Sequence, residues 1–406
     1  MLFKTYRGLP TSVYILFLAR IINRMGDFVK IFLTLYLTRY LNMSSKETGL
    51  IITLIGLFSV AGNIVGGKIT DHTSRKKILL FSQTFSAITV GFCGFIPNSE
   101  MLPWILIAFN FFNGAARPVS TAMLTDLTTT ENRAQSFSLL YLGINIGVSI
   151  GPLAAGFLFN NYRQWIFWGD SITTLLSVLL ILIFVPDLHQ SQIEAHSPGE
   201  AHENESLLKA LLKRPVLLIY SVLALISSFV YSQHSFSLPL ILNDVMNEQG
   251  ARFFGIIMSV NAVSVLVMTP TLTAYLHKQK PLLNMAAGQL CYAIGFGMLF
   301  FASQNYALFI ISTVIWTLGE ILNAINSGVF IANHTPINYR GRFSGFFGTM
   351  KSAGYTLAPL ISGIILESTG LRFIWLVTFV VGMFLFITYR SLESWDRKLN
   401  KIPAEG

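Results

Sequence analysis

Ionisable side chains inside long apolar stretches are the residues of this sequence best suited to chemistry. The stretch 12–38 carries Arg24, Asp27 and Lys30 near its middle, and a later apolar stretch carries Glu320 deep inside it. A charged group at the centre of a membrane span costs roughly 2.5–3.5 kcal/mol on the insertion scale, so such groups face protein or a water-filled cavity. These residues therefore predict polar interior surfaces that bind a polar solute or carry protons.

Two of these carboxyl groups are candidates for proton coupling. Glu320 is the first, because a carboxyl group enclosed in a span can take up a proton on one side of the membrane and release it on the other. Asp27 is the second. A permanent ion pair remains the alternative for both: Asp27 with cations of its own helix, and Glu320 with Lys351 or Arg117.

Polar side chains also share one helical face in several other apolar stretches. Together with the charged stripe of 12–38 they predict a polar central cavity lined by the first, fourth, seventh and tenth spans. An excess of cations there suits an anionic or zwitterionic solute better than a lipophilic cation. The alternative that the charges only pair with one another stays open. The predicted cavity residues are Asn23, Arg24, Lys30, Asn113, Arg117, His234, Trp316, Asn323 and Lys351.

The composition requires membrane helices to position these residues. The chain has 406 residues, of which 53% are hydrophobic and 12% charged, and its mean hydropathy is +0.59. Soluble domains carry about 25% charged residues. Apolar stretches that do not alternate predict an all-α integral membrane protein rather than a β-barrel. Twelve stretches approach the length of about 20 residues that a span needs: 12–38, 49–70, 78–96, 102–124, 135–159, 165–185, 215–242, 253–276, 282–301, 306–332, 342–366 and 372–390.

One long hydrophilic interval divides the chain into halves of six spans. We expect a six-helix bundle at 1–186, a cytoplasmic linker at 187–214, a second bundle at 215–390 and a cytoplasmic tail at 391–406. Under this topology 17 Lys and Arg fall inside and five outside. Short loops rich in Lys and Arg stay on the cytoplasmic side. The sequence therefore predicts a multi-pass protein of the cell membrane with both termini in the cytoplasm, and its net charge of +9 does not indicate nucleic-acid binding.

The two halves repeat each other. Residues of the fifth and sixth spans match residues 207 positions later in the eleventh and twelfth spans, over more than thirty residues. Two parallel repeats of six spans are typical of transporters, with the substrate path between the halves. The matching pairs are Arg133 and Arg340, Gly147 and Gly354, Pro152 and Pro359, Gly156 and Gly363, and Trp168 and Trp375.

Two sequence motifs carry a family resemblance. A short basic hairpin after the second span contains Gly67, Asp71, Arg75 and Lys76, although His72 and Ser74 depart from the usual pattern. The fifth span contains closely spaced small residues that let helices approach and a proline that bends the span: Gly147, Gly151, Pro152 and Gly156. With these motifs the chain resembles the major facilitator superfamily over all twelve spans, and its drug–proton antiporter branch in particular.

The resemblance implies roles for individual residues. Asp71 is expected to face the start of the eleventh span, near Arg340, and to hold a cytoplasmic gate shut. The run from Trp316 to Glu320 is similar to that of small bacterial multidrug transporters, which implies proton coupling at Glu320. The implied energy source is a proton gradient without any other cofactor. We expect protons, a small-molecule substrate and the lipid bilayer as partners, no nucleic acid, and a monomer.

The sequence thus predicts a secondary active transporter that exports small molecules in exchange for protons by alternating access. One alternative is an exporter or symporter of a single metabolite, and another is a membrane sensor or scaffold without transport. An enzyme is not expected, since no nucleophile–base pair or phosphate-binding loop is evident. No metal site is expected either, because Cys93 and Cys291 lie far apart in apolar stretches and three histidines lie in the linker.

Overall fold

A computed structural model describes residues 6–70, 74–128, 130–187, 211–212, 214–276, 279–302, 304–334 and 340–399. Every regular element within these ranges is a helix. By their internal contacts the residues divide into two compact units, Met1–Gly199 with Asn247–Ala262, and Glu200–Met246 with Val263–Gly406.

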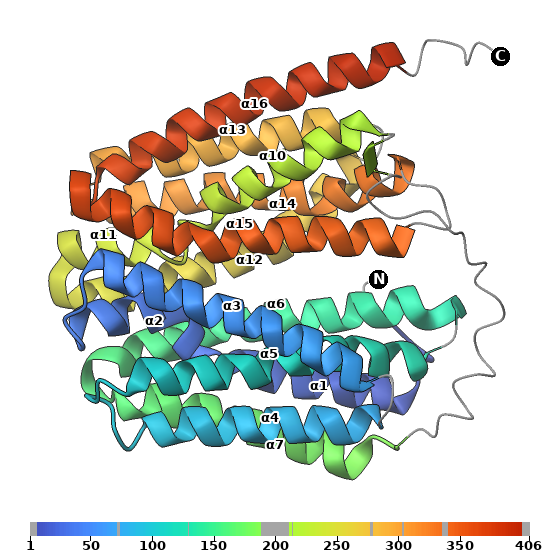
Figure 1. Cartoon of the computed structure of the whole chain (residues 1–406), viewed down its shortest axis with the longest axis vertical. Helices are drawn as coiled ribbons and strands as arrows, with labels where there is room; N and C mark the ends of the chain where they lie inside the picture. The colour runs from blue at the N-terminus through green and yellow to red at the C-terminus, as the bar shows by residue number, and fades with distance from the viewer. Residues whose placement is uncertain are drawn as a thin grey trace. The chain divides into compact units, whose positions relative to one another are not determined.

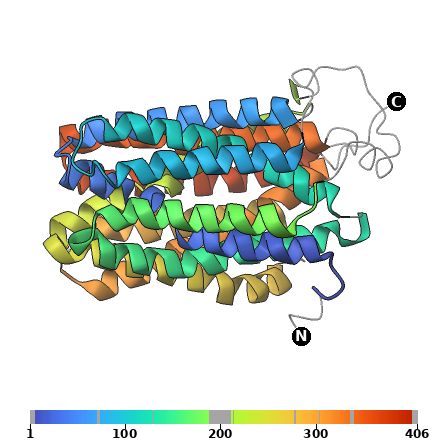
Figure 2. The ribbon, with the colours of Figure 1, turned by 90° about the horizontal axis from the view of Figure 1, so that it is seen from below.

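In the part of the first unit that the structure describes there are seven helices and the beginning of another. In Figure 1, α4 and α7 run side by side, and Figure 2 shows α7 beside α1. The helices are α1 (Thr11–Met25), α2 (Phe28–Arg39), α3 (Ser45–Thr70), α4 (Arg75–Cys93), α5 (Leu102–Asp126), α6 (Thr130–Asn161), α7 (Gln164–Phe184) and the first residues of α12 (Gly250–Leu276).

The second unit contains the remaining helices, and α13 packs against both α14 and α16. These helices are α10 (Pro215–Ser232), α11 (Ser237–Met246), the rest of α12, α13 (Pro281–Gly297), α14 (Tyr306–His334), α15 (Arg340–Thr369) and α16 (Phe373–Leu399), with a short 3₁₀ turn at Met298–Phe301. The other 3₁₀ turn, Asn247–Gln249, precedes α12 and belongs to the first unit.

The prediction of an all-helical membrane protein is confirmed, and a helix or pair of helices occupies each of the twelve predicted spans. Among the described residues, seven segments are long and apolar enough to cross a membrane, one of them running from Pro215 to Thr269. Twelve crossings therefore stay a proposal. The prediction was wrong in treating 12–38 and 215–242 as single helices, because each is interrupted near its middle.

Local sequence signals explain where several helices begin and end. Ser44 and Glu47 form a capping box before α3: the Ser44 N–H donates to the Glu47 carboxylate at 2.8 Å, and the Glu47 N–H donates to the Ser44 hydroxyl at 3.2 Å. Ser74 caps α4 by accepting the N–H of Lys77. Gly370, with φ of +87°, follows the end of α15 in the left-handed conformation that glycine adopts without steric cost.

Helix α7 shows how these sequences fit a lipid environment. Its outward face presents Leu175, Leu179 and Ile183, which are 41–61% exposed. Its buried face carries Asp170 and Thr174 instead. An apolar outside and a polar inside are the reverse of a soluble bundle and suit a helix whose surroundings are hydrocarbon.

The first interruption lies at Gly26–Asp27 and packs directly against α7. A Cβ atom on Gly26 would lie 1.7 Å from the Thr173 hydroxyl oxygen, and one on Gly169 would lie 2.6 Å from the Phe28 ring. Glycines on both sides therefore let the broken segment lie directly on α7. Discontinuous membrane helices leave backbone polar groups free at membrane depth and are found at the binding sites of transporters.

The second interruption, at Gln233–Phe236, lies 207 positions after the first, at the offset of the sequence repeat. The Gln233 side chain stabilises it: its carbonyl oxygen accepts hydrogen bonds from Ser237 at 2.6 Å and Ser362 at 3.0 Å, and its amide donates to the Phe229 carbonyl at 3.0 Å. The repeated halves thus share a broken first helix.

We expect Gly26→Ala to destabilise the protein by about 1–3 kcal/mol, the usual cost of overpacking a close contact. The added methyl group would overlap Thr173, so either α7 or the interruption must shift. The thermal unfolding midpoint of purified protein in detergent measures the effect. Gly348→Ala is the matched control, since a Cβ atom there meets nothing within 4 Å. An unchanged midpoint for Gly26→Ala would show that Thr173 and α7 can shift to accommodate the methyl group without loss of stability.

Candidate functional site

The first unit gathers charged side chains at the interruption of its first span. Arg24 donates from Nη1 to Oδ2 of Asp27 at 2.7 Å, and both side chains are largely buried, at 16% and 12% exposure. Asp27 occupies the N-cap position of α2 but makes no capping hydrogen bond. The ion pair between Arg24 and Asp27, which sequence reasoning left open as one alternative, is therefore present in the structure.

Two further cations act on the same carboxylate. Lys30 of α2 and Arg117 of α5 both interact electrostatically with Asp27. Both side chains are exposed on the unit. Asn113, one turn before Arg117 on α5, is half-buried. A permanent pair would need only one cation, so the excess positive charge here could bind an anionic group.

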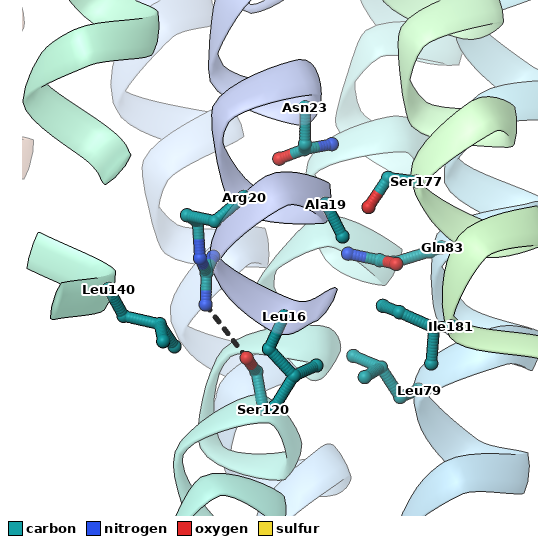
Figure 3. Close-up of a pocket in the computed structure, with 10 residues that line it drawn as sticks. All are labelled: Leu16, Ala19, Arg20, Asn23, Leu79, Gln83, Ser120, Leu140, Ser177 and Ile181. Carbon is teal, nitrogen blue, oxygen red and sulfur yellow. Dashed lines mark hydrogen bonds between the residues drawn. The ribbon is translucent and has the colours of Figure 1, made fainter. Parts of the chain in front are cut away.

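A small polar cavity lies next to this cluster inside the first unit. Arg20 donates to the Ser120 hydroxyl at 2.7 Å, and Asn23 donates to the Thr174 hydroxyl at 3.1 Å. Figure 3 shows Asn23, Gln83 and Ser177 directed toward the cavity from α1, α4 and α7. Its volume of about 20 Å³ has room for one water molecule.

Sequence reasoning missed one member of the cluster, Asp170 of α7. It is 4% exposed, and its Oδ2 accepts the backbone N–H of Val29 at 3.4 Å. It interacts electrostatically with Asp27 and Arg24. The rule that singled out Glu320, an acidic residue inside an apolar stretch, also applies to Asp170 and could have found it.

Glu320 lies in an aromatic cluster of the second unit. Tyr231 donates a hydrogen bond to its carboxyl group, and Tyr292 lies close enough to interact with its charge. His234 stacks on Trp316 with ring centroids 5.5 Å apart, and its Nδ1 lies 2.6 Å from the Tyr231 carbonyl oxygen. Glu320 is half-buried, so the cluster forms one wall around a carboxyl group that keeps some access to its surroundings.

Trp316 is enclosed by other aromatic rings of the second unit. It is fully buried, with Phe296 stacked against it at 5.6 Å between ring centroids. Sequence reasoning placed this side chain in a substrate pocket. In the structure it packs against His234 and Tyr231, which are both half-buried, and its role in substrate binding stays a prediction.

The other predicted cavity residues of the second unit belong to polar contacts. Asn323 accepts a hydrogen bond from Gln289 at 2.8 Å and donates to the Gly319 carbonyl at 2.8 Å. Lys351 of α15 donates to the Ser327 hydroxyl at 3.0 Å. Lys351 therefore bonds α14 at Ser327, a neutral residue two helical turns after Glu320.

The basic hairpin fastens the first unit internally. Arg75 forms an ion pair with Asp126 at the end of α5 at 2.5 Å. Lys76 donates to the carbonyl oxygens of Leu182 and Val185 at the end of α7, where a cation complements the helix dipole. A Cβ atom on Gly67 would meet nothing within 4 Å. Asp71 and the side chain of Arg340, the first residue of α15, lie outside the described residues.

The glycine motif of α6 contacts the first span directly beside its charged cluster. A Cβ atom on Gly147 would lie 2.5 Å from Cβ of Arg24, and one on Gly151 would lie 2.7 Å from the Met25 carbonyl oxygen. Pro152 lies inside α6, and a Cβ atom on Gly156 would lie 3.2 Å from the Ala251 carbonyl oxygen. The two glycines thus let α6 hold α1 just before its interruption.

These observations define a multi-pass helical membrane protein whose spans carry charged and polar clusters. The sequence profile of the Major Facilitator Superfamily matches residues 16–322 and 284–402, so the chain belongs to this family. It is therefore a secondary transporter by family and not an enzyme. The predicted family is confirmed. The drug–proton antiporter branch stays a proposal.

Similar proteins agree with this assignment. The uncharacterized MFS-type transporter YqjV of Bacillus subtilis is 24% identical, with 96% of each chain covered. A Na(+), Li(+), K(+)/H(+) antiporter of Planococcus maritimus is 23% identical over 77% of this chain and 80% of its own. The crystal structure of the nucleoside transporter NupG superposes with a TM-score of 0.77 at 15% identity, covering 94% of this chain and 99% of that one. At this identity the structural likeness concerns the fold.

Proposed function

We propose that this protein is a proton-coupled transporter that exports small organic molecules by alternating access. The observation that carries the proposal is the half-buried carboxyl group of Glu320, hydrogen bonded by Tyr231 in an aromatic cluster within a membrane helix. Ionisable groups at membrane depth are costly and mark proton or ion pathways. Tyr231 can donate to the carboxylate, and the carboxyl group can take up a proton when it is accessible.

The similarity to the Planococcus maritimus antiporter supports exchange against protons, since its name describes a cation/H(+) antiporter. The aromatic faces around Glu320 add a surface to which an organic cation or a flat ring could bind. Twelve membrane crossings, cytoplasmic termini and a gate formed by Asp71 near Arg340 belong to the same proposal. The positive-inside distribution of the loops supports the orientation.

A specific observation favours a second candidate, a transporter of one anionic or zwitterionic metabolite. The cluster of the first unit holds four cations against two carboxylates. The Arg24 Nε atom is buried without a hydrogen-bond partner among the described residues. Such a surplus suits a carboxylate or phosphate group better than a lipophilic cation.

Transport in proteoliposomes with an imposed pH gradient tests the proposal. Ethidium serves as the cationic probe and carboxyfluorescein as the anionic one, and protein-free liposomes and a protonophore serve as controls. Ethidium movement that follows the pH gradient and stops with the protonophore supports proton-coupled export of the multidrug type. Movement of carboxyfluorescein alone supports the second candidate. Absence of flux for these and a broad panel of small solutes would contradict both candidates and favour a sensor or scaffold.

A further inference from the structure

Asp170 is a buried carboxyl group that the proposed function does not yet use. It lies on α7, one turn before Thr174, and is 4% exposed. Among the described residues it forms no ion pair within 4 Å, and its hydrogen bond from Val29 is long, at 3.4 Å. An ionised carboxylate in such a place lacks the close partners that normally offset the loss of water.

The interruption of the first span does not by itself require a carboxyl group. The equivalent interruption in the second unit is stabilised by Gln233, Ser237 and Ser362, which are all neutral. The residue 207 positions after Asp170 is Val377, so the second half of the repeat has an apolar side chain there. Only one of the two equivalent interruptions therefore has a titratable group at this position, Asp170. This difference favours a role for Asp170 in binding and releasing a proton.

Several charged groups lie around Asp170, so binding or loss of its proton changes the charge balance of the cluster. Asp27 at the interruption and Arg24 of α1 act on it directly. Lys30 of α2 and Arg117 of α5 act on Asp27. Helix α4 also packs on this part of α7, where the Ala87 carbonyl oxygen and Gly91 contact the neighbouring Ser171 and carry no charge. A proton on Asp170 would leave Arg24 with one carboxylate instead of two.

A line of polar side chains leads from Asp170 to the small cavity. Asp170, Thr174 and Ser177 recur at helical spacing on the buried face of α7. Asn23 bonds Thr174 and reaches the cavity with Ser177 (Figure 3). The Oε1 atom of Gln83, which lines the same cavity, is buried without a partner among the described residues. A water molecule in the cavity could bond this atom and extend the line of polar groups.

We propose that Asp170 is a proton-carrying residue of this transporter, which shares one proton with Asp27 at the interruption of the first span and exchanges it through the cavity lined by Ser177 and Gln83. The proton adds to a carboxylate oxygen of Asp170 and leaves from the same oxygen. With the proton bound, Arg24 turns fully to Asp27 or to an anionic group of a substrate. This inference rests on the proposed proton coupling, but its test needs no substrate.

Infrared difference spectra between acidic and alkaline pH, recorded on the purified full-length protein, test the proposal. The carbonyl stretch of a protonated carboxylic acid reports each carboxyl group that gains a proton. We expect Asp170→Asn to remove one such band and to lower proton uptake by about one per chain, because Asp27 keeps its ion pair with Arg24 and stays ionised. Asp27→Asn should shift the midpoint of the Asp170 band. The neighbouring Ser171→Ala is the matched control and should leave the band in place.

Asp170→Glu keeps the test decisive if the Asn variant fails to fold. The longer carboxylic acid should retain a band at a displaced frequency. A band that stays at the same frequency in Asp170→Glu, or that persists in Asp170→Asn, belongs to another carboxyl group and overturns the proposal. A wild-type protein that shows the Asp170 band but no pH-driven flux would instead contradict the proposed function and leave the assignment of the proton to Asp170 standing.

Discussion

The Glu320→Gln variant is expected to fold and insert normally but to lose proton-driven transport. Glutamine has nearly the same shape as glutamate and can still accept the hydrogen bond from Tyr231, so the aromatic cluster with His234 and Trp316 should stay packed. It cannot bind and release a proton. A gradient of one pH unit supports about a tenfold concentration ratio for each coupled proton, and the variant should sustain none.

The steady-state ethidium gradient in proteoliposomes at a fixed pH difference measures this loss. Glu367→Gln is the matched control, since Glu367 is exposed near the end of α15 and should not affect coupling. Exchange of ethidium at equal pH on both sides should survive in Glu320→Gln, because it requires movement of the site but no net proton transfer. A tenfold gradient in the variant would remove Glu320 from the proton path.

The helical architecture was predictable because lipid imposes a simple rule. Backbone polar groups must bond internally in hydrocarbon, so every long apolar stretch becomes a helix. The capping box at Ser44 and the glycine at Gly370 follow equally simple local chemistry. These signals depend only on residues close in sequence.

The interruptions were not predicted, because the apolar pattern continues across them. Gly26 followed by Asp27 is a turn signal, but one glycine inside an apolar stretch is often tolerated in a helix. Tertiary contacts decide where the helix breaks, because Gly26 lies against Thr173 and Val29 donates its N–H to Asp170. The repeat could have strengthened the signal, since the polar run Gln233–Ser235 lies at the matching place.

The candidate site was only partly predictable for the same reason. Helical spacing is enough to suggest that Arg24 meets Asp27, three residues away. The sequence does not say which distant helix supplies the next charge, and Asp170 arrives from α7. Trp316, one turn from Glu320, is fully buried, which its sequence position does not reveal, and its role in substrate binding stays a prediction.

The charge balance at the first interruption leads to an asymmetric expectation for stability. Asp27 is the carboxylate that interacts with Arg24, Lys30 and Arg117 together. Removing its charge leaves several like charges near one another, with Asp170 as the remaining acid of the cluster. Removing the charge of Arg24 reduces the surplus, and Asp27 keeps its interactions with the other two cations.

We therefore expect Asp27→Asn to lower the free energy of unfolding by about 3 kcal/mol, the lower end of the cost of breaking a buried ion pair from one side. Arg24→Gln should cost less than about 1 kcal/mol, since it also relieves repulsion. Unfolding of the purified variants in mixed micelles, with the double variant to complete the cycle, measures the coupling between the two residues, expected at about 1–3 kcal/mol.

Equal losses for the two single variants would mean that Arg24 and Asp27 act as an isolated pair. A larger loss for Arg24→Gln would mean that the cluster lacks cations rather than acids, and the surplus positive charge would then not be available to bind an anionic group.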